Sequence, residues 1–203
     1  MADQPTRLTC TCGHVELRVQ GRPIIGVECL CADCQSAGAF LQSLPGAPVV
    51  LDRNGATRFV LYRKDRVRCE KGQERLREHR LSERTTTRRA VAVCCNTPMF
   101  LEFTQGHWLS IYGGLWSAES QPALEMRTMT RSRAEGVALP DDVPNPATHT
   151  LSFYAKLFLA WAGMGFRAPR VDFVNGRLEA SDAERLGIGR RDARLGSDPS
   201  RGQ

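Results

Sequence analysis

The sequence predicts a mainly β fold with a C-terminal helix, and three observations support this prediction. Short apolar segments separated by turn residues run through the first half of the chain. One long apolar segment spans residues 151–164, and eight cysteines cluster at close spacings. Because 41% of the 203 residues are hydrophobic, the chain can bury an ordinary core, which excludes a disordered or fibrous protein.

The expected strands follow from alternation and from turn residues. Val15, Leu17 and Val19 alternate with polar residues, which is the period of a half-buried strand. Gly, Pro and Asn-Gly turns bound further expected strands at residues 24–30, 49–51, 57–62, 67–69, 86–93, 99–103, 108–112 and 124–129. A short helix is expected at 36–41. Strands of this length and spacing indicate a sandwich, a barrel or a related β fold.

The apolar segment at 151–164 predicts a helix with Thr148 or Thr150 as its N-cap. A helix that is apolar on nearly every side is usually buried against its own sheet or at a subunit interface, so a homo-oligomer is one expected arrangement. Ser152 and Lys156 interrupt the segment, which is shorter than the roughly 18 apolar residues of a membrane span. The first residues lack the apolar region of a secretory signal, so a cytoplasmic protein is expected.

The expected organisation has three parts. Residues 1–130 form a β domain, and residues 131–178 form a loop and the apolar helix, which packs on that domain. Residues 179–203 are expected to be a disordered tail, because Gly, Ser, Asp and Arg dominate them without periodicity.

The motif Cys29-Leu-Cys31-Ala-Asp-Cys34 places three thiols within six residues, on one side of a loop. Soft thiolates at this spacing favour zinc or an iron–sulfur cluster, and the chain lacks a ferredoxin-type cysteine run. Zinc is therefore the expected metal. Three protein thiolates leave one tetrahedral position open, which distinguishes a catalytic zinc site from a closed structural one. Disulfides are not expected in a reducing compartment.

The remaining cysteines predict a second metal site. Cys10-Thr-Cys12-Gly13 places two thiols on one tight turn, and Cys94 and Cys95 could complete a four-thiolate site with them. The domain of residues 1–130 is thus expected to bind two zinc ions. Cys69 is isolated on an expected strand, where it acts as a small buried hydrophobe.

In this order, the motifs resemble a known enzyme family. Thr9-Cys10-Thr11-Cys12-Gly13, the CxCxxC motif, a cysteine pair before Thr-Pro and Ile111-Tyr-Gly-Gly-Leu115 are similar to the glutathione-dependent formaldehyde-activating enzymes, also called the CENP-V family, over about residues 8–130. The resemblance implies an Mss4-like zinc-binding β fold. It also implies a carbon–sulfur lyase, in which one zinc is structural and one catalytic, acting on S-hydroxymethylglutathione, the adduct of the thiol glutathione and the aldehyde formaldehyde.

The resemblance also implies roles for individual cysteines. Cys10 and Cys12 are structural zinc ligands, whereas Cys29, Cys31 and Cys34 hold the catalytic zinc.

Where the family has CxxCG, this chain has Ala92-Val93-Cys94-Cys95-Asn96, so Cys95 matches the second cysteine and Ala92 stands in place of the first, for which Cys94 could substitute. Adjacent residues on a strand point in opposite directions, so both cysteines bind one ion only if the chain turns at 96–98. Cys69 and His14 are the alternative fourth ligands.

Two further departures lie in the catalytic loop, which has Leu30 and Gln35 where the family commonly has His and Arg. The chain is therefore expected to be a divergent offshoot whose thiol need not be glutathione.

A rival interpretation is a zinc-stabilised binding module. The window of residues 63–89 has 11 basic and five acidic residues, which accounts for the whole net charge of +6. Such a stretch could hold nucleic acid or another polyanion, or it could be a solvated face. No aromatic residue lies within the window, whereas surfaces that bind single strands interleave aromatic and basic residues. Nucleic acid is therefore not the expected partner.

Overall fold

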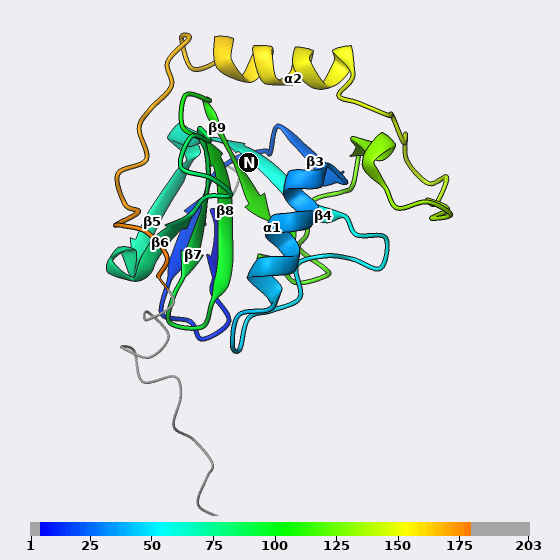
Figure 1. The fold of residues 1–203 in the computed structure, drawn as a ribbon. Helices are drawn as coiled ribbons and strands as arrows, with labels where there is room; N and C mark the ends of the chain where they lie inside the picture. Colours follow the sequence, from blue (N-terminus) through cyan, green and yellow to red (C-terminus); the bar gives the residue numbers. More distant parts are fainter. Residues whose placement is uncertain (1–4, 180–203) are drawn as a thin grey trace, which may run out of the picture.

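The computed structural model describes residues 5–179, which form two β-sheets and two α-helices (Figure 1). The small sheet has the order β1 (Thr6–Thr9), β2 (Glu16–Val19) and β5 (Val67–Lys71). The large sheet has the order β10 (Met126–Thr128), β3 (Ile25–Cys29), β4 (Thr57–Arg63), β9 (Trp108–Tyr112), β8 (Thr97–Phe103), β7 (Thr87–Ala92) and β6 (Leu76–His79). Neighbouring strands are antiparallel except β10 and β3, which are parallel. The helices are α1 (Ala32–Gln42) and α2 (Leu151–Ala162). The prediction of a mainly β fold with a C-terminal helix is confirmed.

The strand predictions fail where side chains give little signal. The sequence analysis does not predict β1 and β6, because each is four residues long and carries a single leucine, Leu8 or Leu76, among polar residues. The strand predicted at 49–51 is wrong. Its backbone is held by the Gln42 side chain, whose Oε1 accepts hydrogen bonds from the N–H groups of Val50 and Leu51.

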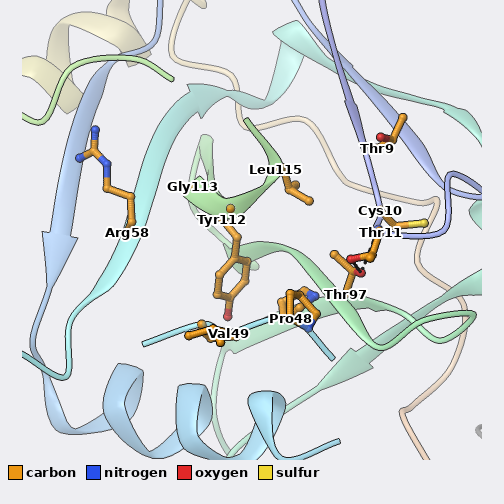
Figure 2. A pocket seen from close by; sticks show the side chains of 13 residues that line it. Thr9, Cys10, Thr11, Pro48, Val49, Arg58, Thr97, Tyr112, Gly113 and Leu115 are labelled. Carbon is orange, nitrogen blue, oxygen red and sulfur yellow. Dashed lines mark hydrogen bonds between the residues drawn. The ribbon is translucent and has the colours of Figure 1, made fainter. Parts of the chain in front are cut away.

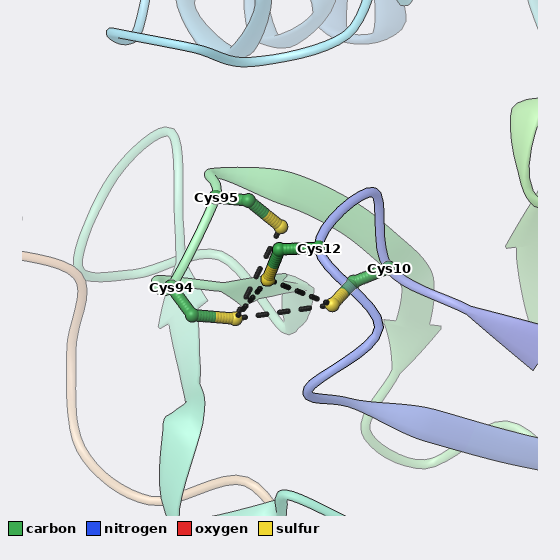
Figure 3. Close-up of side chains that lie close together, drawn as sticks. All are labelled: Cys10, Cys12, Cys94 and Cys95. Carbon is green, nitrogen blue, oxygen red and sulfur yellow. Dashed lines mark hydrogen bonds between the residues drawn. The ribbon is translucent and has the colours of Figure 1, made fainter. Parts of the chain in front are cut away.

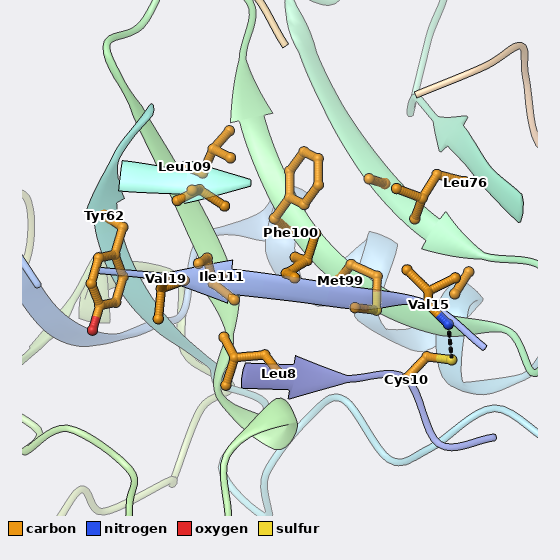
Figure 4. Close-up of a cluster of buried hydrophobic side chains, with 14 of the residues drawn as sticks. Leu8, Cys10, Val15, Val19, Tyr62, Leu76, Met99, Phe100, Leu109 and Ile111 are labelled. Carbon is orange, nitrogen blue, oxygen red and sulfur yellow. Dashed lines mark hydrogen bonds between the residues drawn. The ribbon is translucent and has the colours of Figure 1, made fainter. Parts of the chain in front are cut away.

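The large sheet is buried on both faces, which explains its nearly continuous apolar strands. On one face, Leu8 and Leu17 of the small sheet pack against Phe100 and Ile111, as Figure 4 shows for part of this cluster. On the other face, Phe59 lies in a second cluster, which also contains residues of α1 and α2. The fold is therefore a small sheet, a large sheet and a helical layer, with the cysteine motif at the junction of β3 and α1.

Helix α2 lies across one end of the molecule in Figure 1 and is buried on one side only. Thr150 caps it, with its side chain accepting a hydrogen bond from the N–H of Phe153. Phe153 and Leu157 are buried, whereas Phe158 and Leu159 are exposed. None of the helices in residues 5–179 combines the length and the apolar character that crossing a membrane would require.

The domain division at residue 130 stays a prediction. The tail predicted over residues 179–203 lies outside the described residues, except for residue 179 itself.

Candidate metal centres

Four cysteines from two distant segments meet at one end of the two sheets. Cys10 and Cys12 follow β1, whereas Cys94 and Cys95 lie in the turn between β7 and β8, and their sulfurs point toward one another (Figure 3). The Sγ atom of Cys94 lies 3.8 Å from that of Cys10, 3.3 Å from that of Cys12 and 4.0 Å from that of Cys95. The Sγ atoms of Cys10 and Cys12 are 3.6 Å apart.

These distances match the size of a zinc–thiolate tetrahedron. Four sulfurs at about 2.3 Å from a central ion lie about 3.8 Å from one another. All four Sγ atoms lie within 4.8 Å of one another, so the group could hold one metal ion with little rearrangement. The N–H of Val15 also donates to the Sγ of Cys10 at 3.2 Å, which orients this sulfur.

A tight turn lets both adjacent cysteines face the same point. Asn96 has a φ of 52°, in the left-handed region, and its side chain donates to the carbonyl of Pro45 at 2.9 Å. The structure therefore brings Cys94, rather than Cys69 or His14, into the group. Cys69 lies apart and donates to the Lys71 carbonyl, and burial raises the pKa of its thiol to about 11. The Nδ1 atom of His14 lies 3.0 Å from the Sγ of Cys12, beside the group.

The second group consists of Cys29, Cys31 and Cys34, whose sulfurs lie within 4.8 Å of one another. Cys29 ends β3, Cys31 is the N-cap of α1 and Cys34 lies in its first turn. The helix thus begins inside the motif, earlier than the predicted residue 36. The N–H of Cys34 donates to the Sγ of Cys31, and helix N-termini favour thiolates. Hydrogen bonds with Cys29 and Cys34 lower the pKa of the Cys31 thiol.

The two positions that depart from the resembled family support the loop from inside. Leu30 is fully buried in the protein. The Nε2 atom of Gln35 donates to the carbonyls of Leu30 at 2.5 Å and Ser132 at 2.8 Å. These contacts hold the cysteine loop against the segment that follows β10.

A buried cation lies beside the three-cysteine group. Arg89 is only 2% exposed, and it donates to the Asp33 carbonyl at 3.2 Å and hydrogen-bonds with Tyr112. Its charge also contributes to the lowered pKa of the Cys31 thiol. Three thiolates around a divalent ion carry a net negative charge, which a buried guanidinium offsets. Sequence spacing gives no signal for this arrangement, because 56 residues separate Arg89 from Asp33.

Other residues of the basic window are also buried, so the window of residues 63–89 is not a solvated face throughout. The Nζ of Lys64 lies 2.5 Å from Glu102, and both side chains are at most 2% exposed. Arg88 pairs with the same carboxylate at 2.6 Å. These charges are compensated internally and leave a smaller basic surface for a polyanion.

The three cysteines form part of the wall of a cavity of about 610 Å³ between the large sheet and α2. The lining residues come from the sheet, from the cysteine loop, from the segment after β10 and from α2; they are Val27, Cys29, Cys31, Ala32, Asp33, Cys34, Phe59, Leu61, Leu101, Phe103, Trp108, Ser110, Thr128, Met129, Arg131, Ser132, His149, Phe153, Tyr154 and Leu157. Most of this surface is apolar. Ligand sites have this character, with a few polar groups converging at one place.

His149 is a functional candidate that the sequence analysis does not identify, because no other potential metal ligand lies near it in the sequence. Its Nδ1 lies 2.8 Å from the Oγ1 of Thr128, and its ring stacks on Phe153 with centroids 4.5 Å apart. Burial lowers the pKa of this imidazole. The half-buried imidazole of His149 therefore lines the cavity close to the cysteine loop.

A smaller cavity of about 210 Å³ lies beside the four-cysteine group (Figure 2). Thr11, Thr97, Tyr112 and residues 113–115 contribute to its wall. The Thr97 hydroxyl accepts a hydrogen bond from the N–H of Thr11 at 3.1 Å. This contact joins the turn that contains Cys10 to β8, so the cavity lies where the small sheet meets the large sheet.

Comparison with known proteins assigns the chain to a family whose function is unknown. The sequence model of DUF6151, described as a family of unknown function, matches residues 3–115, a segment that contains both cysteine groups. No curated protein matches the chain. A crystal structure of a Rhodobacter sphaeroides protein aligns with a TM-score of 0.40 and 17% identity, covering 70% of this chain and 100% of that one. A likeness of this degree supports no inference about function.

Proposed function

We propose that this chain, which belongs to DUF6151, a family of unknown function, is a zinc-dependent enzyme that forms or breaks the carbon–sulfur bond of a thiol–aldehyde adduct. One observation carries the proposal: three converging cysteine sulfurs form part of the wall of a ligand-sized cavity. The resemblance to the glutathione-dependent formaldehyde-activating enzymes supports the same reaction class.

The two cysteine groups differ in the way that structural and catalytic zinc sites differ. The first supplies four sulfurs, enough to complete a tetrahedron; Cys10, Cys94 and Cys95 are buried and Cys12 is exposed. The second supplies three, and Cys31 is half-buried at the cavity. A zinc ion held by three thiolates supplies Lewis acidity and lowers the pKa of a thiol that occupies its fourth position.

The chain's own residues account for the rest of the chemistry. In the forward direction the thiol sulfur bonds to the aldehyde carbon, and the thiol proton ends on the former carbonyl oxygen; the reverse reaction restores both. His149 is placed to exchange this proton, because Thr128 holds its Nδ1 and leaves Nε2 for the substrate. The rest of the cavity lining is mostly apolar.

Metal analysis and NMR exchange together test the proposal. The purified protein should contain about two zinc ions per chain, and Cys31→Ser should remove one of them. Zinc-loaded protein should accelerate exchange between formaldehyde and its adducts across a panel of thiols, in a manner that depends on Cys31. Iron with visible absorbance, or exchange no faster than the uncatalysed rate with every thiol, would refute the proposed function.

A further inference from the structure

The cavity has a long apolar floor that starts at the cysteines. In the large sheet, Cys29 of β3 pairs in register with Thr57 of β4. A second pair, Ile25 with Leu61, lies four residues from Cys29 along β3. At about 3.3 Å per residue, the floor extends about 13 Å from Cys29 to the level of Leu61. Trp108 and Phe103 line the cavity at the far end of β9 and β8. The metal-binding end and the apolar end are therefore distinct.

Most polar groups of the cavity gather at the cysteine end, and Ser110, which pairs in register with Leu61, is the exception. Thr128 pairs in register with Cys29, and it hydrogen-bonds to His149. The charged groups that line the cavity, besides the cysteines and His149, are Asp33 and Arg131, and both are exposed. They have opposite charges and so give the cavity no net preference for an anion.

This lining does not match glutathione. Glutathione carries two carboxylates and one ammonium group, and each charge that leaves water needs a paired partner. Apart from His149, Arg131 is the single basic side chain among the described residues that line the cavity, so the lining offers one positive charge against two carboxylates. Formaldehyde alone, with two heavy atoms, would also leave most of a cavity of about 610 Å³ unfilled.

We infer that the thiol partner of this site is an uncharged thiol with an aromatic or alkyl group, whose sulfur lies at Cys29, Cys31 and Cys34 and whose apolar group lies along the floor toward Phe103 and Trp108. The inference rests on the proposed function, because it takes the thiol as the fourth ligand of the zinc. Aromatic side chains in the lining favour a flat or alkyl group through apolar contact.

The test compares benzyl mercaptan with glutathione. Each thiol is titrated into zinc-loaded protein by calorimetry and into cobalt-loaded protein, in which a new thiolate ligand changes the visible spectrum. Benzyl mercaptan should bind at least about tenfold more tightly, since its ring and methylene leave water for an apolar surface.

A matched pair of variants locates the bound group. Phe103 lines the far end of the cavity and is 42% exposed, whereas Phe158 is 56% exposed on the outer side of α2 and does not line the cavity. Phe103→Ala should weaken benzyl mercaptan binding about fivefold, through the lost apolar contact, and leave glutathione binding unchanged. Phe158→Ala should change neither affinity.

The possible failures can be told apart. If no thiol changes the cobalt spectrum, the proposed function fails and the inference fails with it. If glutathione binds as tightly as benzyl mercaptan, or if Phe103→Ala behaves like Phe158→Ala, the apolar inference is overturned while thiol binding at the metal stands.

Discussion

Cys94 is one of the four cysteines whose sulfurs converge, so Cys94→Ser should destabilise the protein more than Cys31→Ser or Cys69→Ser does. Its Sγ contacts the sulfurs of Cys10, Cys12 and Cys95, at 3.8, 3.3 and 4.0 Å. The group joins the turn after β1 to the turn between β7 and β8. Because the metal-binding free energy of a structural site is folding free energy, losing this ligand should destabilise the contact between the two sheets.

The size of the effect follows from linkage. Free zinc at about 1,000 times its dissociation constant stabilises a site by about 4.1 kcal/mol. If the loss of one thiolate weakens binding about 100-fold, about 2.7 kcal/mol of this stabilisation disappears. A serine hydroxyl buried among the remaining sulfurs costs about 1 kcal/mol more. For a chain of this length the melting temperature should fall by about 7–15 °C.

Thermal unfolding with parallel zinc analysis measures this effect, and Cys69→Ser is the control. Cys69 is half-buried outside the group, and its Sγ donates to the Lys71 carbonyl, a bond that a serine hydroxyl can also make. The control should retain two zinc ions and lose less than about 1 kcal/mol. If the Cys94→Ser protein keeps both zinc ions and has the same melting temperature as the Cys69→Ser protein, the four-thiolate assignment is wrong.

Four further outcomes are expected. The Cys31→Ser protein should stay folded and lose one zinc ion, because the three-cysteine site lies at a cavity and does not join the two sheets. A melting temperature below that of the Cys94→Ser protein would show that the structural and catalytic roles are exchanged. A zinc-sensitive dye should show both sites emptying as the pH falls, since bound thiolates must stay deprotonated, and metal retained at pH 4 would contradict thiolate ligation. In urea unfolding, Lys64→Met should lower the unfolding free energy by about 3 kcal/mol, because it leaves the buried Glu102 carboxylate with one partner fewer. As a control, substitution of an exposed residue, Arg68→Met, should change the unfolding free energy by less than about 0.5 kcal/mol. Gln35→Leu should speed zinc loss to a chelator from the three-cysteine site, and Gln42→Leu, in the same helix, should not.

Local patterns in the sequence predicted the elements whose residues carry a repeated signal. Val15, Leu17 and Val19 are all buried, as their alternation indicated. The cysteine spacings predicted both groups, and the Asn-Thr-Pro segment indicated the turn that lets Cys94 and Cys95 act together. By contrast, β1 and β6 each contain one apolar residue, so pairing with neighbouring strands, rather than periodicity, forms them.

Contacts between distant segments could not be predicted from spacing. Lys64 reads as part of a solvated basic stretch, and only the fold shows that Glu102 meets it inside the protein. His149 stands alone in the sequence, yet the loop before α2 brings it to Thr128 and into the cavity. Tertiary packing decides which carboxylate or metal ligand approaches a given side chain, and the composition of the sequence does not reveal this packing.

The departures in the cysteine loop and the character of the cavity agree with each other. Leu30 is buried and Gln35 binds two backbone carbonyls, so neither presents a charge or an imidazole to a substrate. Arg89 supplies a cation at the cysteines, but it is buried and engaged by Asp33 and Tyr112, so it is not placed to hold a substrate carboxylate. The proposed recognition therefore rests on apolar contact with Phe103, Trp108 and their neighbours, which is the basis for expecting an uncharged thiol at the three-cysteine site.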